Sequence, residues 1–562
     1  MAISAPAAAQ TVVGDWHGTL DAGGTRLPLA VHIQWSPDDE LTGTLDSPSQ
    51  GVNGMRIDEI SRDPGVLAFT VPTVGGSYDG RWDAQAGRWK GEWRQGGTAL
   101  ALDFEAGLLP ETEVAAPAPL PQDWAIPGDE AIARLIDERN ALRAGQGMVV
   151  GVLEADGERI IARGPAGAAA FDGASLFEIG SISKVFTALL LADMANKGEV
   201  SLDDPAAKYL PAGHRMPERG GRQITLRNLS QHTSALPRVP DNMPRGDPED
   251  PYADYTEEQL LAFLDGYELT RDIGVQHEYS NLGVGLLGYL LGRAAGKDYE
   301  TLLAERITGP LGMGDTVVTL RQGAPLVQGH DVYMRPAKPW DLPTLVGAGG
   351  IRSNADDMLK FARAVLDPAS PIADAVATTL ANRFDLGSTA AQQALGWGVS
   401  RPGPARELIS HSGGTGGYRS TLVLEPSRKR AAVVLMNSAV EPSATDFAMH
   451  LLVGSPLARA QPVPPARTEV TLPQAELERV VGRYDFGAGI EFAVTLQGGV
   501  LVAQRQGAVT GQLLPLFAEA PLLFFLKAAD VRARFTTDDS GIVTGAVLTL
   551  GGQELSGTKV AP

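Results

Sequence analysis

FEIGSISKVF, residues 177–186, is the stretch that decides how the central part of this chain folds. Apolar residues continue its pattern and recur at Ile182, Val185, Phe186, Leu189, Leu190 and Met194. A spacing of about 3.6 residues predicts a helix whose apolar stripe lies against a core. We expect this helix to begin near Ser181 and to end at Gly198, since glycine commonly follows a helix C-terminus.

Ser181 and Lys184 form an S-x-x-K pattern one helical turn apart, so the amine can reach the hydroxyl. A serine hydroxyl becomes a good nucleophile only when a nearby base takes its proton. A lysine in a partly apolar pocket can lose its charge and act as that base. The N–H groups at the start of the helix would favour the negative charge that develops during acyl transfer.

The alternative is that Ser181 simply caps the helix and that Lys184 is an exposed lysine. A second copy of the pattern, Ser556 to Lys559, shows that S-x-x-K alone is a weak signal. This copy lies in a short alternating segment, QELSGTKV at 553–560, which predicts a terminal strand without chemistry. The partners of Ser181 must therefore be sought elsewhere in the chain.

The composition excludes several classes of function. The 562-residue chain has 47 Lys and Arg against 67 Asp and Glu, a formal charge of −20, which disfavours nucleic acids and anionic membranes as partners. It has no cysteine, so disulfides, thiolate metal sites and a cysteine nucleophile are excluded. Its eight histidines show no H-E-x-x-H motif, and no apolar run is as long as a transmembrane helix. We expect no metal, no cofactor and no membrane span.

A chain of this length predicts two to four domains. The expected division is 1–10 for a signal-peptide remnant or disordered N-terminus, 11–107 for a β-barrel, 108–122 for a linker, 123–457 for a mixed α and β domain, 458–469 for a second linker, and 470–562 for a second β-domain. Both linkers are rich in proline, and only the middle segment shows long helical patterns. Residues 7–10, Ala-Ala-Ala-Gln, resemble the end of a signal peptide, so we expect an exported, periplasmic or secreted protein.

In the first β-segment apolar residues alternate with others, as at Leu27, Leu29, Val31, Ile33 and Trp35. About eight short strands of this kind predict a small antiparallel barrel. The tryptophans of this segment are Trp16, Trp35, Trp82, Trp89 and Trp93. They would either fill the barrel or line a ligand cavity, and filling is the more common use.

Two further patterns each occur once, in the middle segment. Tyr279-Ser280-Asn281 is a Y-x-N motif, and the apolar pattern after it predicts a helix that ends at Gly296. His411-Ser412-Gly413 is an H-x-G motif at the start of a glycine-rich run that enters a predicted strand. The helix after Asn281 also contains G-x-G-x-x-G at 283–288, but no strand precedes it, so we expect close helix packing rather than a dinucleotide site.

In the order S-x-x-K, Y-x-N and H-x-G, the three motifs resemble those of the class C β-lactamases and penicillin-binding-protein-like serine hydrolases, over about residues 123–457. Four more segments resemble this family, at 177–211, 229–237, 347–361 and 395–398. The resemblance implies an α/β (α+β) fold with an antiparallel sheet flanked by helices, beside a helical subdomain. The terminal segments resemble the lipocalin-like β-barrel domains of some relatives, including D-aminopeptidases.

The resemblance also implies a role for each motif residue. Ser181 would be the nucleophile and Lys184 its base. Tyr279 would move a proton between Ser181 and the leaving group, with its pKa lowered by nearby positive charge. Asn281 would orient Lys184 and the substrate amide. The backbone N–H groups of Ser181 and Gly414 would form the oxyanion hole.

The chain departs from the family at His411, where many relatives have the lysine of a K-T-G motif. A histidine of ordinary pKa is largely neutral at pH 7, so it would hold a substrate carboxylate poorly. This departure favours esters, amides or D-aminopeptidase-like substrates over penicillins. Gly413 and Arg419 are further candidates for substrate contact, although the more common use of an arginine such as Arg419 is on the surface.

These inferences predict a serine hydrolase that acts through an acyl-enzyme on ester, amide or peptide bonds of small-molecule or short-peptide substrates, including peptides with D- or non-standard residues. One alternative is a D,D-carboxypeptidase or β-lactamase. The other is a non-catalytic protein that uses the same fold and its barrels to bind ligands. Loss of Lys184, Tyr279 or an oxyanion glycine would indicate the non-catalytic case, and all are present. The oligomeric state stays open.

Overall fold

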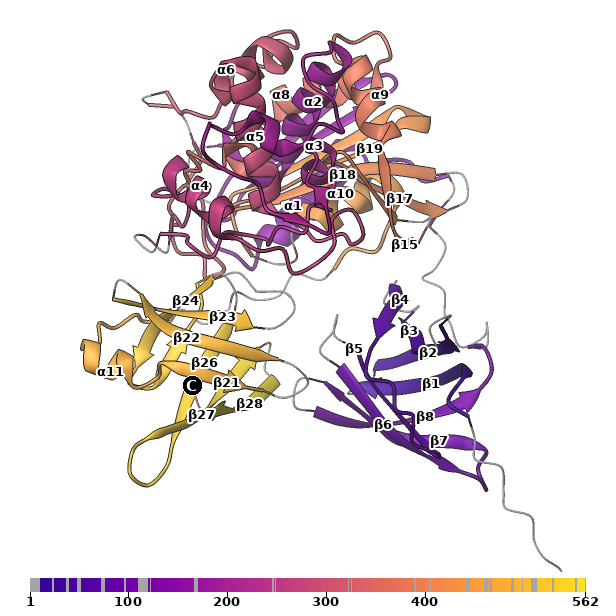
Figure 1. Cartoon of the computed structure of the whole chain (residues 1–562). Helices are drawn as coiled ribbons and strands as arrows, with labels where there is room; N and C mark the ends of the chain where they lie inside the picture. Colours follow the sequence, from indigo (N-terminus) through magenta and orange to yellow (C-terminus); the bar gives the residue numbers. More distant parts are fainter. Residues whose placement is uncertain are drawn as a thin grey trace, which may run out of the picture.

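The computed structural model of the protein describes residues 11–22, 25–36, 40–47, 52–71, 76–95, 98–109, 120–121, 123–165, 170–244, 247, 249–321, 323–324, 326–388, 391–403, 406–440, 442, 444–458, 463, 467–486, 490–497, 499–506, 513–527, 530–550 and 553–560. The expected signal-peptide remnant at 1–10 and most of both expected linkers lie outside these ranges. A β-barrel, a mixed α and β part and a second β-barrel follow one another along the chain (Figure 1). This is the predicted fold class.

The first part is an eight-stranded antiparallel sheet with the order β4-β3-β2-β1-β8-β7-β6-β5. Its strands are β1 (Gly14–Ala22), β2 (Thr25–Trp35), β3 (Leu41–Ser47), β4 (Val52–Ile57), β5 (Val66–Val71), β6 (Gly76–Asp83), β7 (Arg88–Gln95) and β8 (Thr98–Ala106). Asp58 and Thr70 exchange two backbone hydrogen bonds of 2.8 Å, which join the two edges of the sheet. The sheet is therefore a nearly closed barrel.

Most of the tryptophans fill this barrel, as predicted. Trp16 and Trp89 are almost fully buried and pack edge to face at 5.6 Å, and Trp82 packs against both. Trp93 is also buried. Trp35 neither fills the barrel nor lines a cavity: it is 51% exposed at the end of β2, with Arg62 Cζ 5.5 Å from its ring centroid.

The middle part is built on an eight-stranded antiparallel sheet with the order β10-β9-β20-β19-β18-β17-β16-β15. Its strands are β9 (Met148–Glu154), β10 (Gly157–Arg163), β15 (Arg383–Ser388), β16 (Ala391–Ala394), β17 (Gly398–Gly403), β18 (Arg406–Gly414), β19 (Arg419–Glu425) and β20 (Arg430–Met436). Val150 and Val152 of β9 pack with α1 (Asp129–Asn140) and α10 (Ala444–Val453), whereas Val149 joins the core on the opposite face. Helices therefore cover both faces of the sheet.

The opposite face carries α2 (Ser183–Asn196) and α8 (Ala355–Leu366), and a helical region extends beyond them (Figure 1). The other elements of this part are α3 (Leu226–Ser230), α4 (Glu257–Gly266), α5 (Asn281–Ala295), α6 (Tyr299–Leu303), α7 (Val346–Gly349), α9 (Ala373–Ala381), the short helical turns η2 (Gly180–Ile182), η3 (Ala206–Tyr209), η4 (Ala304–Thr308) and η5 (Pro426–Arg428), and the strand pairs β11 (Phe177–Glu178) with β14 (Arg352–Ser353) and β12 (Glu218–Arg219) with β13 (Arg222–Gln223). Among the helices in the described ranges, none has both the length and the apolar character needed to cross a membrane.

Local sequence explains α5, the helix that follows the Y-x-N motif. Ser280 caps it by accepting a hydrogen bond of 2.8 Å from Gly283 N, and Gly296 ends it with a φ of +64°. A Cβ on Gly285 would lie 2.7 Å from the Leu345 side chain, and one on Gly288 would lie 3.1 Å from a backbone atom of α7. The glycines of the G-x-G-x-x-G pattern therefore allow close helix packing, as predicted.

The third part is a closed antiparallel barrel that follows α11 (Gln474–Glu478). Its strands are β21 (Gly482–Asp485), β22 (Glu491–Gln497), β23 (Val500–Gln506), β24 (Leu513–Ala520), β25 (Leu523–Phe525), β26 (Val531–Thr537), β27 (Val543–Leu550) and β28 (Gln553–Val560). The second S-x-x-K copy lies in β28, which confirms the prediction of a strand for that segment.

Candidate active site

Ser181 lies at the start of the predicted helix. The strand β11 leads into the turn η2, which continues as α2. We predicted one apolar stripe, but α2 is buried on nearly all sides, because residues outside the stripe such as Leu191 and Ala192 are also fully buried. Ser181 itself stays partly exposed. Gly198 follows the helix with a φ of +72°.

Lys184 reaches Ser181 as the S-x-x-K spacing predicts. Its Nζ lies 3.0 Å from Ser181 Oγ, 2.9 Å from Asn281 Oδ1 and 2.6 Å from the backbone oxygen of Ala348. The two carbonyl oxygens can only accept hydrogen bonds. A neutral amine has two N–H groups and one lone pair, so these two oxygens take both N–H groups. The lone pair then faces the hydroxyl of Ser181.

The surroundings of Lys184 favour the neutral amine. Lys184 is fully buried, and burial together with the nearby Arg238 guanidinium holds the pKa of Lys184 well below its usual value. Burial disfavours the charged form of an amine, and a second cation disfavours it further. The neutral amine is the form that can accept the proton of Ser181.

Tyr279 contacts the same hydroxyl. Its ring is flanked by the amine of Lys184 and the guanidinium of Arg238. Lys184 Nζ lies 4.8 Å and Arg238 Cζ 5.1 Å from the ring centroid. A hydrogen bond with Ser181 and the charge of Arg238 lower the pKa of Tyr279, but burial outweighs both and raises it to about 12. The predicted lowering of this pKa is therefore wrong, because the loss of water around the phenol has the larger effect.

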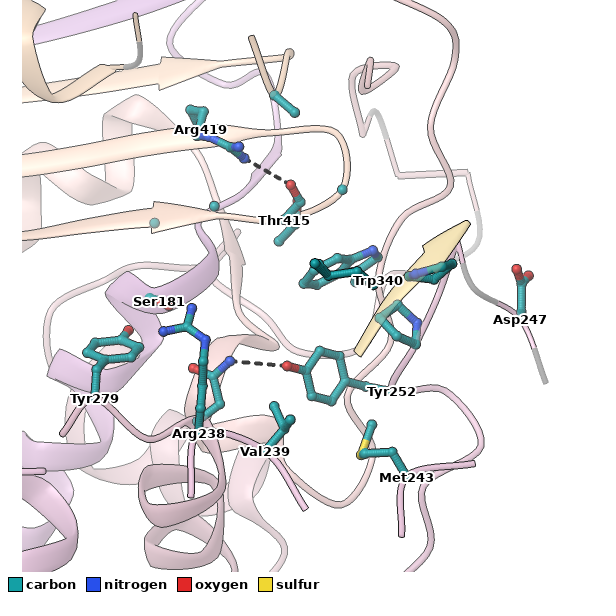
Figure 2. A pocket seen from close by; sticks show the side chains of 18 of the residues that line it. Ser181, Arg238, Val239, Met243, Asp247, Tyr252, Tyr279, Trp340, Thr415 and Arg419 are labelled. Atoms are coloured by element: carbon teal, nitrogen blue, oxygen red, sulfur yellow. Dashed lines mark hydrogen bonds between the residues drawn. The ribbon is translucent and has the colours of Figure 1, made fainter. Parts of the chain in front are cut away.

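Asn281 holds Lys184 and is itself held in place. While its Oδ1 accepts from Lys184, its Nδ2 donates to the Tyr252 hydroxyl at 3.1 Å (Figure 2), and its backbone N–H donates to the oxygen of Arg238 at 2.9 Å. One N–H of the side-chain amide thus goes to Tyr252. No motif or periodic pattern indicates Tyr252, which lies in a loop without regular structure.

The H-x-G motif lies at the end of β18, and the turn comes after it rather than within it. His411 Nδ1 donates to the backbone oxygen of Ser412 at 2.7 Å, so the neutral ring presents Nε2 as an acceptor. Burial, with the charge of Lys184, lowers the pKa of His411 to about 4. His411 is accordingly neutral at pH 7.

The glycines of this motif allow β18 to pass close to the serine turn. A Cβ on Gly413 would lie 2.0 Å from the backbone oxygen of Ile179, and one on Gly180 would lie 2.7 Å from Gly414 N. The φ of Gly180 is +49°, which glycine adopts without strain. Gly414 N thus lies beside the first turn of the helix that carries Ser181, where N–H groups have no helical partner.

These groups face a cleft of about 620 Å³, a volume typical of sites for small organic ligands. Figure 2 shows Ser181, Tyr279 and Arg238 at one end of it, with Tyr252 next to them. The candidate residues that line the cleft are Ser181, Tyr279, Asn281, His411, Gly413, Gly414 and Arg419. Within the part of the chain that the structure describes, no group of three or more His, Asp or Glu could hold a metal ion.

Two arginines line the cleft in different ways. Arg419 Nη1 donates to the backbone oxygens of Thr415 and Tyr418, each at 3.0 Å, and so supports the turn after β18. Arg238 is exposed, and its guanidinium points into the cleft between Tyr279 and Tyr252 (Figure 2). No sequence motif includes Arg238, although it directly follows the family-like segment 229–237.

Two buried titratable residues also support the site. The ring of His232 lies 4.4 Å from that of Tyr279, and its Nδ1 accepts from Ser280 N at 3.1 Å. His232 has a φ of +60°, which is uncommon for a residue other than glycine. Glu178 accepts a hydrogen bond of 2.7 Å from Trp340 N, and burial raises its pKa to about 7. Both residues lie in segments that resemble the family, but neither belongs to one of the three motifs.

Comparison with known proteins identifies the family. The chain matches the family model described as Beta-lactamase over residues 132–453. The D-alanyl-D-alanine-carboxypeptidase/endopeptidase AmpH of Escherichia coli (strain K12) is 34% identical over 277 residues, which cover 47% of this chain and 71% of AmpH. Penicillin-binding protein 4* of Bacillus subtilis (strain 168) is 26% identical over 394 residues, which cover 64% of this chain and 83% of that protein.

A solved structure agrees with these matches. The β-lactamase/D-alanine carboxypeptidase from Yersinia pestis, complexed with citrate, is 26% identical with a TM-score of 0.50 and covers 56% of this chain and 95% of its own. The family model alone matches more than half of the chain. The chain therefore belongs to the Beta-lactamase family and is a serine hydrolase.

Proposed function

We propose that the protein hydrolyses ester or amide bonds of small substrates through an acyl-enzyme on Ser181. The observation that carries this proposal is the 3.0 Å contact between Lys184 Nζ and Ser181 Oγ, made by a buried amine whose other two polar neighbours are oxygens that can only accept hydrogen bonds. As Ser181 Oγ bonds to the substrate carbonyl carbon, its proton passes to Lys184 Nζ. The oxygen of that carbonyl becomes negative, and the N–H groups of Ser181 and Gly414 receive it. Loss of one such donor typically costs about 2.7–4 kcal/mol.

Lys184 rather than Tyr279 is the base in this proposal. With a pKa of about 12, Tyr279 would require on the order of 7 kcal/mol to lose its proton at pH 7. Lys184 holds its lone pair without that cost, because burial and Arg238 already disfavour its charge. Tyr279 instead gives its phenolic proton to the leaving oxygen or nitrogen and regains one from Lys184.

Deacylation reverses these roles. A water molecule attacks the acyl carbon, gives its proton to the Lys184–Tyr279 pair, and releases the acid as Ser181 Oγ regains a proton. His411 has no charge at pH 7 to offer a substrate carboxylate, which supports neutral esters and amides, including peptides with D- or non-standard residues. Its Nε2 can accept a hydrogen bond from a substrate N–H instead.

A second candidate is D,D-carboxypeptidase or β-lactamase activity. Arg238 favours it, because an exposed guanidinium beside Tyr279 can receive the carboxylate that His411 cannot hold. The names of the E. coli and Y. pestis relatives point to the same activities. The two candidates differ in whether the substrate carries a carboxylate near the scissile bond.

Intact-mass measurement of acylation tests the proposal and separates the candidates. The full-length protein is mixed with a p-nitrophenyl ester, a D-amino-acid amide or a penicillin, and the mass added to the protein is followed in time. We expect an adduct with the ester or amide that Ser181→Ala abolishes. Ser556→Ala, the same change in the S-x-x-K copy on β28, is the matched control and should leave the adduct intact. An adduct that persists in Ser181→Ala would refute the mechanism.

A further inference from the structure

The cleft that contains Ser181 has a wall that belongs to the C-terminal barrel. The barrel residues that line it are Gln497, Val500, Val502, Leu514 and Pro515, from the neighbouring strands β22, β23 and β24. Val502 and Pro515 are register partners, so their side chains share one face of the barrel. These residues lie more than 300 positions after Ser181 in the sequence, and none belongs to the family motifs.

Strand alternation places most of this wall on the outer face of the barrel; Leu514 is the exception, because it pairs with Ala503 and packs against the barrel core. Leu501 and Ala503 of β23 belong to the core inside the barrel, so Val500 and Val502 point outward. Val502 is nevertheless only 5% exposed. An outward valine is buried here because the middle part of the chain covers this face of the barrel.

Apolar packing and an ion pair hold the barrel in this position. Phe517 and Phe525 form one cluster with three residues of the middle part, and the ring of Phe525 packs edge to face against Tyr333 at 5.9 Å. Lys527 Nζ lies 2.6 Å from a carboxylate oxygen of Glu249. The backbone oxygen of Glu249 accepts from the indole N–H of Trp340, which also lines the cleft.

One polar group of the wall is unsatisfied. Gln497 is only 6% exposed, and its Nε2 donates to the hydroxyl of Thr495. Its Oε1 has no hydrogen-bond partner among the described residues. A buried acceptor without a partner costs about 1–3 kcal/mol, so a ligand N–H that reached it would be bound favourably.

We propose that this outer face of the barrel is a subsite that binds a peptide-like acyl chain, with apolar groups against Val500, Val502 and Pro515 and an N–H donating to Gln497 Oε1. The proposal rests on the acyl-enzyme at Ser181 proposed above. The subsite selects long acyl groups over short ones, because an acetyl group at Ser181 fills only a small part of the cleft. The donor requirement further separates an amide-containing chain from a plain hydrocarbon chain.

Three p-nitrophenyl esters with the same scissile bond test this subsite in the full-length protein: an acetyl ester, an octanoyl ester, and an ester of an N-acetylated dipeptide with apolar side chains. For the wild type, kcat/KM should rise from the acetyl to the dipeptide ester. In Gln497→Leu it should fall about tenfold for the dipeptide ester, equal to about 1.4 kcal/mol. The acetyl and octanoyl esters should be unaffected.

Two further variants separate loss of the subsite from loss of folding. Gln506→Leu makes the same change at a glutamine on β23 that does not line the cleft, and it should leave all three rates unchanged. Val502→Ser weakens the apolar wall and should slow both long esters while sparing the acetyl ester. Equal effects of Gln497→Leu and Val502→Ser on all three esters, or no effect on any, would overturn the subsite. No acylation of the wild type by the acetyl ester would instead overturn the proposed function.

Discussion

The substitution Arg238→Gln tests whether a cation outside the three motifs lowers the pKa of Lys184. Arg238 Cζ and Lys184 Nζ lie 5.1 and 4.8 Å from the centroid of the same Tyr279 ring, so their charges are no more than about 10 Å apart. At an effective dielectric constant of about 20, Coulomb's law gives about 1.7 kcal/mol, or about 1.2 pKa units. Solvent weakens this interaction because Arg238 is exposed. We expect the pKa of Lys184 to rise by about 1 unit in the variant.

The acid limb of the pH profile measures this shift. A general base must be unprotonated, so the limb of kcat/KM at low pH follows the pKa of Lys184. With a neutral p-nitrophenyl ester, the limb should move to higher pH by about one unit, and the rate below the limb should fall about tenfold. The plateau above it should stay close to that of the wild type, because Lys184 is neutral there in both proteins.

Controls separate the electrostatic effect from other causes. Arg222→Gln removes a charge from the exposed hairpin of β12 and β13 and should leave the limb in place. Raising the salt concentration to about 1 M should reduce the difference between wild type and Arg238→Gln, since the Debye length is then about 3 Å. A limb that stays fixed in Arg238→Gln, or that moves to lower pH, would refute the reasoning.

The remaining predictions concern His411 and Glu178. In His411→Lys, the rate of acylation by a penicillin should rise about tenfold to a hundredfold, because an ammonium–carboxylate hydrogen bond contributes about 1.5–3 kcal/mol. Hydrolysis of a neutral ester should slow, because the new charge would have to lose its water. Equal loss of both activities would show that His411 takes part in proton transfer. The Glu178 carboxyl keeps its proton up to about pH 7 in the folded protein but only up to about 4.5 when unfolded, so the wild-type free energy of unfolding should fall as pH rises between these values. Urea unfolding at several pH values should show that Glu178→Gln removes this part of the slope, and an unchanged slope would contradict it.

Much of the fold and part of the site could be predicted from local sequence patterns. A period of two predicted the strands of both barrels, because burial of one face of a strand imposes that repeat. A period of 3.6 predicted α2 and α5 with their terminal glycines, although α2 is buried on nearly all sides. The pairing of Ser181 with Lys184 follows from helical geometry alone, since residues three apart share a helix face. The second S-x-x-K copy could be set aside for the same reason, because its surroundings alternate as a strand does.

Other properties were decided only by the tertiary structure. The pKa of Tyr279 rises rather than falls because its ring is buried among groups from distant segments, and no sequence pattern measures that burial. Arg238 and Tyr252 reach the site from irregular loops, which leave no periodic signal. The barrel wall at Gln497 meets the cleft through contacts between parts that are hundreds of residues apart. Sequence therefore determined the elements and the nucleophile with its base, because those depend on neighbours along the chain. Folding decided desolvation and the walls of the cleft, because those depend on neighbours in space.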